Sequence, residues 1–268
     1  MKKRILTVTA LSTLLLLTAC SAPKGLDVVG QESISAFDKV LTAIPDKVNA
    51  EKSNDAWSIT SPDQEVRFIW SADYSTSPLY DVMLELDARP FLEAGLDPEK
   101  LPDNYYFTQS NAQDVDTTDG TTNNTTTNSN DGGTLDNGGT YDTNPRLIVG
   151  TKLGTDTPDD KDDSSPLTAY KQIVNHYRDS INYHNTLDHY GVKLGDGNMF
   201  EWAKDMSTNE YDKSVQDKDI VYVLNPEPLI AAGVDPEKVT GWAYAQVPIE
   251  ENGKPVQVFK FLKAFDLK

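Results

Sequence analysis

Few side chains in this sequence are of the types that most often carry out chemistry. The chain has one cysteine, Cys20, and three histidines, His176, His184 and His189. Two metal ligands on one helix face must lie three or four residues apart, as in the H-E-x-x-H pattern. These histidines are eight and five residues apart, in a segment whose apolar spacing is typical of a helix. We therefore predict no metal site and interpret the histidines as helix-surface residues.

A second candidate is the pattern Phe-x-Trp-x-x-Asp-x-Ser-Thr, which begins at Phe68 and again at Phe200. We expect its two aromatic residues to share one face of a strand, because alternate residues of a strand do so. The polar residues that follow either form a turn at the strand end or line two equivalent binding sites. These candidate binding residues are Asp73, Ser75, Thr76, Asp205, Ser207 and Thr208.

The repeated pattern belongs to a longer internal duplication, which must be recognised before single motifs are interpreted. The segment 90–100 matches 228–238, and both contain Ala-Gly-x-Asp-Pro-Glu-Lys. Upstream of the aromatic pattern, apolar residues follow the spacing of one helix face in both copies. The matching positions are Phe37, Val40, Leu41, Ile44 and Val48 in the first copy and Tyr170, Ile173, Val174, Tyr177 and Ile181 in the second.

Helix boundaries follow from capping residues and proline. In the second copy, Ser165 can cap a helix that has proline in its first turn, which predicts a helix over about residues 166–188. In the first copy, Ser33 or Ser35 can start the helix, and Pro45 should kink or end it.

Short runs of β-forming residues follow each helix and predict strands. They cover 65–72, 81–88, 198–204 and 219–224. The second copy ends with runs at 242–248 and 256–262, joined by Glu251-Asn252-Gly253-Lys254. Asn-Gly between two such runs is a strong hairpin signal. In the first copy the matching runs are 105–107 and 147–149.

Between those last two runs lies a polar insert, residues 109–144, rich in Asn, Thr, Asp and Gly. It cannot bury enough apolar surface to offset its ordering entropy, and we predict disorder. The predicted organisation is a signal segment 1–19, a tether 20–32, a first repeat 33–153, a linker 154–165 and a second repeat 166–268.

The order of elements predicts an α+β fold. Each copy should consist of one helix packed on an antiparallel sheet, and the two copies stand in tandem. In element order this arrangement resembles cystatin-like and PepSY-like folds. A resemblance at the level of the fold implies no function.

The N-terminus has the features of an export segment. Three basic residues, Lys2, Lys3 and Arg4, precede an apolar run from Ile5 to Leu17, and small residues follow. A helix needs roughly 20 apolar residues to span a bilayer. The run is therefore too short for a permanent membrane span.

The four residues Leu17-Thr18-Ala19-Cys20 resemble the lipobox of bacterial lipoproteins. The resemblance implies cleavage between Ala19 and Cys20 and attachment of a diacylglyceryl group to the Cys20 sulfur. Two acyl chains anchor a protein stably, here at the extracytoplasmic face of the cell membrane. The duplicated architecture is also similar to uncharacterised tandem-repeat lipoproteins of Gram-positive anaerobes, which implies no activity.

Charge excludes two classes of partner. The chain has 42 acidic and 24 basic residues and a formal net charge of −18. Loss of residues 1–19 removes three positive charges and no negative ones. Nucleic-acid binding needs a basic face that neutralises phosphates, and attraction to anionic head groups needs polybasic runs. Neither is present after the signal segment.

Two functional hypotheses remain open. The chain contains no nucleophile elbow, Walker loop or dinucleotide glycine fingerprint, so we predict neither catalytic residues nor a cofactor. The favoured hypothesis is a non-enzymatic binding or interaction module of the cell envelope, whose partner is an envelope protein or a small ligand. The alternative is an envelope hydrolase with acidic catalytic residues between the two halves.

Overall fold

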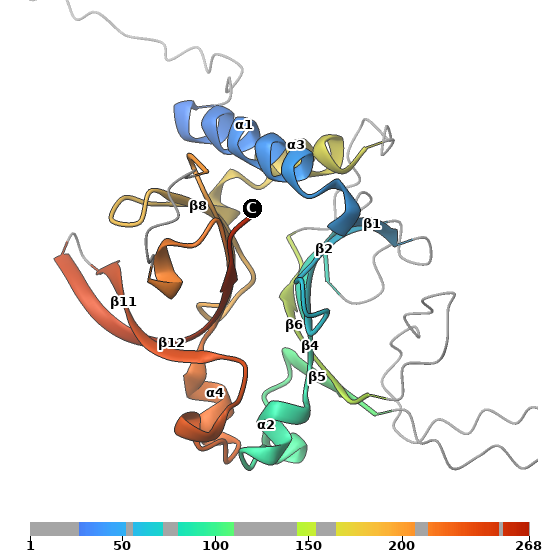
Figure 1. Ribbon diagram of the computed structural model, residues 1–268, viewed down its shortest axis with the longest axis vertical. Coiled ribbons are helices and arrows are strands. Elements are labelled where there is room, and N and C mark those ends of the chain that lie inside the picture. The colour runs from blue at the N-terminus through green and yellow to red at the C-terminus, as the bar shows by residue number, and fades with distance from the viewer. Residues whose placement is uncertain are drawn as a thin grey trace, which may run out of the picture.

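The computed structural model describes residues 27–51, 56–71, 80–109, 144–153, 165–206, 214–251 and 254–267, which form two facing sheets with helices at both ends (Figure 1). The first half contains α1 (Val28–Ala43), η1 (Pro45–Lys47), β1 (Val48–Glu51), β2 (Ala56–Thr60), β3 (Val66–Ser71), β4 (Val82–Asp87), α2 (Arg89–Glu93), η2 (Pro98–Lys100), β5 (Tyr105–Thr108) and β6 (Arg146–Thr151). The second half contains α3 (Pro166–His176), η3 (Arg178–Ser180), β7 (Ile181–His184), β8 (His189–Lys193), β9 (Met199–Ala203), η4 (Val215–Asp217), β10 (Ile220–Leu224), α4 (Pro226–Ala231), η5 (Pro236–Lys238), β11 (Ala243–Glu251) and β12 (Lys254–Phe265).

The two sheets are antiparallel and have the same topology. Their strand orders are β1-β2-β3-β4-β6-β5 and β7-β8-β9-β10-β12-β11. The register also matches, because Phe68 of β3 lies opposite Leu84 of β4 and Phe200 of β9 lies opposite Tyr222 of β10. The predicted α+β fold with two tandem copies is confirmed.

The helix boundaries differ from those predicted. The helix α1 begins earlier, with the Asp27 side chain accepting a 2.7 Å hydrogen bond from the Gly30 amide, and it ends before Pro45 as expected. The helix α3 ends at His176 rather than near residue 188, and Tyr177 leaves the helical region with φ −129° and ψ 49°. Asp179 and Ser180 follow at once, and such residues bond readily to nearby backbone outside helices.

The chain beyond α3 therefore forms a hairpin that the apolar spacing did not predict. Ile181 begins β7 instead of continuing the helix, and β7 pairs with β8. The equivalent hairpin in the first half, β1 with β2, was also missed. Both edge strands are short and largely polar, so they lack the alternation that marks a half-buried strand. The runs predicted as β3, β4, β5, β6, β9, β10, β11 and β12 do form strands.

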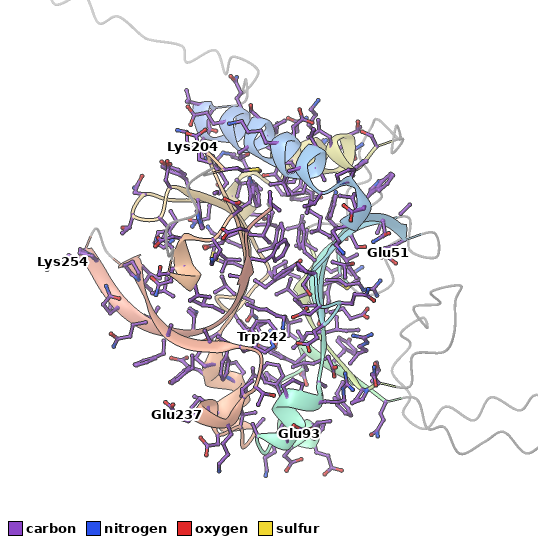
Figure 2. All side chains as sticks on the ribbon, in the orientation of Figure 1. Glu51, Glu93, Lys204, Glu237, Trp242 and Lys254 are labelled. Atoms are coloured by element: carbon purple, nitrogen blue, oxygen red, sulfur yellow. The ribbon has the colours of Figure 1, made fainter. Side chains whose placement is uncertain are left out.

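One apolar core fills the space between the two sheets. Phe68 and Phe200, which occupy equivalent positions, stack on each other with ring centroids 4.2 Å apart and planes 6° apart. Trp70 and Trp202 are fully buried in the same cluster. Trp242 also lies between the sheets, 5.8 Å from the Phe91 ring (Figure 2). The halves consequently share a core rather than each having its own.

The two long helices strengthen this sharing, because each packs over strands of the opposite half. The helix α1 contacts β7 and β9, and α3 contacts β2 and β3. The Trp70 indole nitrogen donates a 3.1 Å hydrogen bond to the Pro166 carbonyl. The Tyr170 hydroxyl donates to Ser33 Oγ at 3.2 Å. In Figure 1 the two helices lie side by side across one end of the sheet pair.

At the other end, the repeated Ala-Gly-x-Asp-Pro segments meet each other. The Asp97 amide donates to the Ala232 carbonyl and the Asp235 amide donates to the Ala94 carbonyl, each at 2.8 Å. Gly95 and Gly233 have φ values of 105° and 104°, and a Cβ on either would lie 2.8 Å from the other's carbonyl oxygen. Only glycine fits this approach. The Ala-Gly-x-Asp-Pro segments therefore join the two copies to each other.

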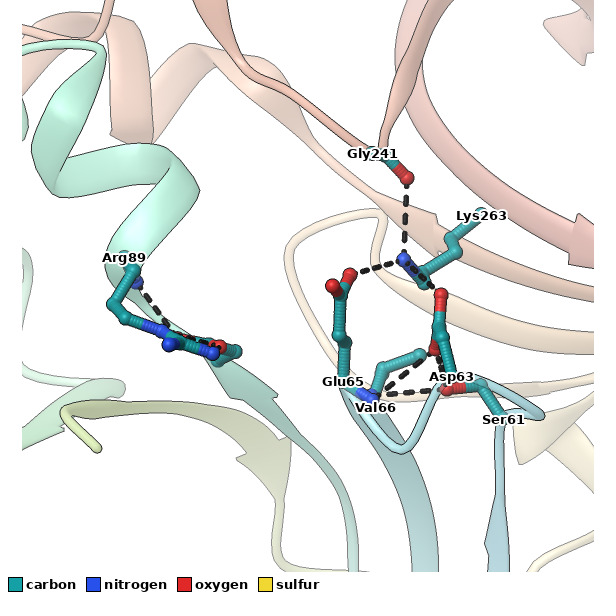
Figure 3. A network of polar contacts seen from close by, with 8 residues as sticks. Ser61, Asp63, Glu65, Val66, Arg89, Gly241 and Lys263 are labelled. Atoms are coloured by element: carbon teal, nitrogen blue, oxygen red, sulfur yellow. Dashed lines mark hydrogen bonds and ion pairs between the residues drawn. The ribbon is translucent and has the colours of Figure 1, made fainter. Parts of the chain in front are cut away.

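A buried lysine adds a charged connection between the sheets (Figure 3). Lys263 of β12 is 9% exposed, and its Nζ lies 2.6 Å from Asp63 Oδ2 and 2.5 Å from Glu65 Oε2. It also donates to the Gly241 carbonyl at 3.3 Å. Partial burial acts to raise the pKa of Asp63, but hydrogen bonds from Lys263, Ser61 and the Glu65 amide lower it below its ordinary value.

The polar insert begins and ends at adjacent points of the fold. Most of it, residues 110–143, lies outside the described residues, so the predicted disorder is not addressed; the same holds for most of the linker. The flanking strands β5 and β6 pair directly, with Thr108 opposite Arg146. A short turn can therefore replace the insert without moving either strand.

We expect deletion of Gln109 to Asn144, with an Asn-Gly turn in its place, to change the melting temperature by no more than a few degrees. Loop-closure entropy depends only weakly on loop length. Circular dichroism melts of the deletion variant and of the intact protein measure the change. A control deletion that extends through β5 removes a paired strand and should lower the melting temperature clearly. A large fall for the first deletion would mean that the insert packs on the domain.

Candidate functional site

The candidate residues of the repeated aromatic pattern do not form a site within the described part of the chain. Asp73, Ser75, Thr76, Ser207 and Thr208 lie outside the described residues, as do Ala19 and Cys20. Asp205 is described, is 77% exposed, and forms a 3.1 Å ion pair with Lys39 of α1. It belongs to the surface contact between the second half and α1.

His176 is an exposed helix residue as predicted, whereas His184 and His189 are placed differently from the prediction. His176 ends α3, but His184 and His189 lie on β7 and β8 and face each other as cross-strand partners. His189 is 2% exposed, with Nδ1 3.8 Å from Glu201 Oε2. Within the described residues, no group of three or more His, Cys, Asp or Glu side chains could hold a metal ion.

A pocket of about 460 Å³ opens on the outer face of the second sheet. This face points away from the shared core, because Met199 and Glu201 alternate with the buried Phe200 and Trp202. The turn between β7 and β8 forms one wall, and the long β11–β12 arm, which curves away from the sheet in Figure 1, forms the other. The volume lies within the range of about 300 to 1,000 Å³ that is usual for ligand sites.

The floor of the pocket is apolar. Val221, Val223, Val247 and Leu262 form a buried cluster there, separate from the core between the sheets. Met199 and Leu187 pack against this cluster. The wall formed by the arm adds Pro248, Ile249 and Pro255.

The equivalent outer face of the first sheet is covered by an ion-pair network. Arg67 lies 2.9 Å from Glu51 Oε1 and 2.8 Å from Glu85 Oε2, and all three side chains are at least 85% buried. The Ser58 hydroxyl donates to the same Glu51 oxygen at 2.6 Å. Arg146 Nε lies 3.7 Å from Glu85 Oε1, so two arginines balance the two carboxylates on this face of the sheet.

Register identifies the residues that replace this network in the second half. His184, Met199 and Val223 occupy the positions of Glu51, Arg67 and Glu85, and Gly191 occupies that of Ser58. The replacements remove both acidic groups and the arginine. At Gly191 a Cβ would lie 2.9 Å from Met199 Cε and 3.1 Å from Glu201 Cγ, so these two side chains occupy the space beside it. The second half therefore lacks the ion-pair network, and its pocket is lined by His184, Met199 and Val223 at the equivalent positions.

Three charged residues line this pocket: Glu201, Lys260 and Lys193, whose ammonium group donates to the Asp179 carbonyl at 3.0 Å. Glu201 is 6% exposed, and among the described residues its only polar contact is the 3.8 Å approach of His189. Lys260 of β12 donates to the Gly197 carbonyl at 3.1 Å. Burial lowers the pKa of Lys260 below its ordinary value, and the nearby carboxylates of Glu227 and Glu201 oppose that effect. His184 also lines the pocket, with a buried Nε2 that has no hydrogen-bond partner in the described structure.

The pocket was not predicted from the sequence, although one of its residues lies within the repeated aromatic pattern. Glu201 is the variable position of the second Phe-x-Trp pattern, where the first copy has Ile69. A charge at a buried position where the other repeat has an apolar residue is a usable signal. No local sequence pattern marks Lys260, His184 or Met199 as pocket residues. They come close together only through the pairing of strands.

Comparison of the chain with models of protein families, with curated proteins and with solved structures gave no match. The candidate site is therefore argued from the geometry of this chain alone. No helix among the described residues is long and apolar enough to cross a membrane.

Proposed function

We propose that this protein is a lipid-anchored, extracytoplasmic binding protein whose ligand site is the pocket of the second half. The observation that carries the proposal is the difference between the two copies. One fold, built twice in one chain, has an ion-pair network on its outer face in the first half and a pocket with three charged residues in the second. A structural role alone would not require that difference.

The lining supports binding of a small ligand. An apolar floor with a few polar groups at defined positions is typical of ligand sites, because apolar contact supplies affinity and polar groups fix orientation. Glu201 is 6% exposed, lines the pocket and accepts no hydrogen bond from the described residues, so a cationic group of a ligand can pair with its carboxylate. Anchoring through Cys20 would hold this pocket at the cell surface.

The alternative of a hydrolase with acidic catalytic residues between the halves has less support. The described residues between the two sheets are chiefly the shared apolar core. The acidic residues described there, Asp63 and Glu65, are engaged by Lys263. The outer pocket contains Glu201 as its acidic side chain, whereas a pair of carboxylates is the usual requirement for acid-base hydrolysis of glycosides.

A fluorescence titration with 1-anilinonaphthalene-8-sulfonate tests whether the pocket accepts a ligand. The dye combines an apolar body with an anionic group that can approach Lys260, and we expect saturable binding of one molecule per chain. The triple substitution His184→Glu, Met199→Arg and Val223→Glu copies the network of the first half. We expect it to close the pocket and to abolish dye binding.

Two further variants make this test specific. Met199→Trp fills the pocket without adding charge and should also abolish binding. Phe259→Ala removes the 45% exposed aromatic ring of β12 and should leave binding unchanged. Dye binding that survives both filled variants, or that is lost with Phe259→Ala, would contradict the proposed site. Melting curves of each variant establish that it is folded.

A further inference from the structure

The charges that face the pocket also indicate the chemical class of its ligand. Glu201 offers a buried anion, and the described residues supply it with no hydrogen-bond donor. Lys260 offers an ammonium group with one bond to a carbonyl, which leaves two of its three donors for a ligand. Neither charge forms an ion pair with the other within the described structure. A ligand that satisfies both needs a cationic and an anionic group.

The positions of the two charges set an upper limit on the length of that ligand. The Lys260 ammonium is held at Gly197, and Glu201 follows Gly197 by four residues. With a rise of about 3.3 Å per residue, these positions are at most about 13 Å apart. Three extended residues span up to about 10 Å, and the two side chains can close the remaining distance.

The apolar floor lies between the two charges. Val221 is paired with Glu201 across β9 and β10, and Leu262 is two residues from Lys260 on β12. Side chains of a ligand that runs from Glu201 to Lys260 would therefore contact Val221, Val223 and Leu262. Apolar side chains would be favoured there because their burial against the floor removes apolar surface from water.

We infer that the pocket binds a short peptide of up to four residues with apolar side chains, its free amino terminus at Glu201 and its free carboxylate at Lys260. The inference rests on the proposed function, because it specifies the ligand of the same pocket. The negative charge of the whole chain favours approach by the amino-terminal end.

Isothermal titration calorimetry with trileucine and two capped derivatives tests the inference. N-acetylation removes the cation and C-terminal amidation removes the anion, and we expect each to weaken binding by at least about tenfold. In Glu201→Gln the effect of N-acetylation should disappear while the effect of amidation remains. In Lys260→Met the effect of amidation should disappear while the effect of N-acetylation remains. Such cycles assign each terminus to one residue.

Glu237→Gln is the matched control for charge. Glu237 is exposed on η5 and lies near the bottom of the view, apart from the arm tip at Lys254 (Figure 2); it does not line the pocket, and its substitution should change no binding constant. Equal affinity for free and capped peptides, or an N-acetylation effect that persists in Glu201→Gln, would overturn the inference. The capped peptides test it in the unaltered protein even if a variant fails to fold. Dye binding without peptide binding would defeat this inference and leave the proposed pocket; loss of both would defeat both.

Discussion

Trp202→Ala is expected to lower the free energy of unfolding by roughly 3 to 5 kcal/mol, the usual cost of removing a large buried aromatic side chain. Trp202 is fully buried and lies 5.0 Å from the Phe37 ring of α1 and 5.5 Å from the Tyr170 ring of α3. Because both helices lose a contact, the effect should reach both halves. Urea denaturation followed by circular dichroism should show one transition, shifted to lower denaturant.

Two comparisons make this expectation specific. The indole nitrogen of Trp202 is buried without a hydrogen-bond partner in the described structure, whereas that of Trp70 donates to Pro166. Trp202→Phe should therefore cost less stability than Trp70→Phe, although both lose the same atoms. Val28→Ala, at a 69% exposed position, should stay within about 0.5 kcal/mol. A similarly small effect of Trp202→Ala would contradict the core assignment.

Cys20→Ser is expected to abolish lipid attachment, because the sulfur is the atom that would accept the diacylglyceryl group. Metabolic labelling with radioactive palmitate should give no labelled protein, and the protein should no longer sediment with membranes. Cleavage at Ala19 should also fail, since the lipobox resemblance implies that processing follows lipid transfer.

Ser21→Ala is the control, because it changes the neighbouring residue and leaves the sulfur. It should label and sediment as the unaltered protein does. Globomycin, which inhibits lipoprotein signal peptidase, should lead to accumulation of the uncleaved precursor of the unaltered chain. A Cys20→Ser protein that still incorporates palmitate would show that the anchor lies elsewhere or that the resemblance misleads.

The sequence alone was sufficient for the duplication, for most strands and for the fold class. These features depend on local signals: alternation of apolar residues, an aromatic pair two residues apart, and a glycine at the end of a short helix. The two copies repeat these signals in the same order, so one copy supports the interpretation of the other. Burial of Trp70 and Trp202 followed from the same pattern.

Local sequence patterns gave wrong predictions in two situations. In one, the segment was short and polar; in the other, the same apolar spacing fitted both a helix face and a turn that leads into a strand. Tyr177 and Ile181 continue the spacing of α3, yet they belong to a turn and to β7. Periodicity does not distinguish a helix face from a turn that leads into a strand when the apolar residues are few. The histidines were consequently assigned to a helix, and their position beside Glu201 was not foreseen.

Only the tertiary structure decided how the halves share a core and where a ligand could bind. That α1 packs on β7 and β9 depends on contacts between distant segments, which no local pattern encodes. The pocket arises because strand pairing aligns His184, Met199 and Val223 where the first half has Glu51, Arg67 and Glu85. Each substitution is unremarkable in the sequence. These residues lie on the same face of the sheet, and together they line one pocket. This follows from the pairing of strands, since a side chain's neighbours in a sheet come mainly from other strands.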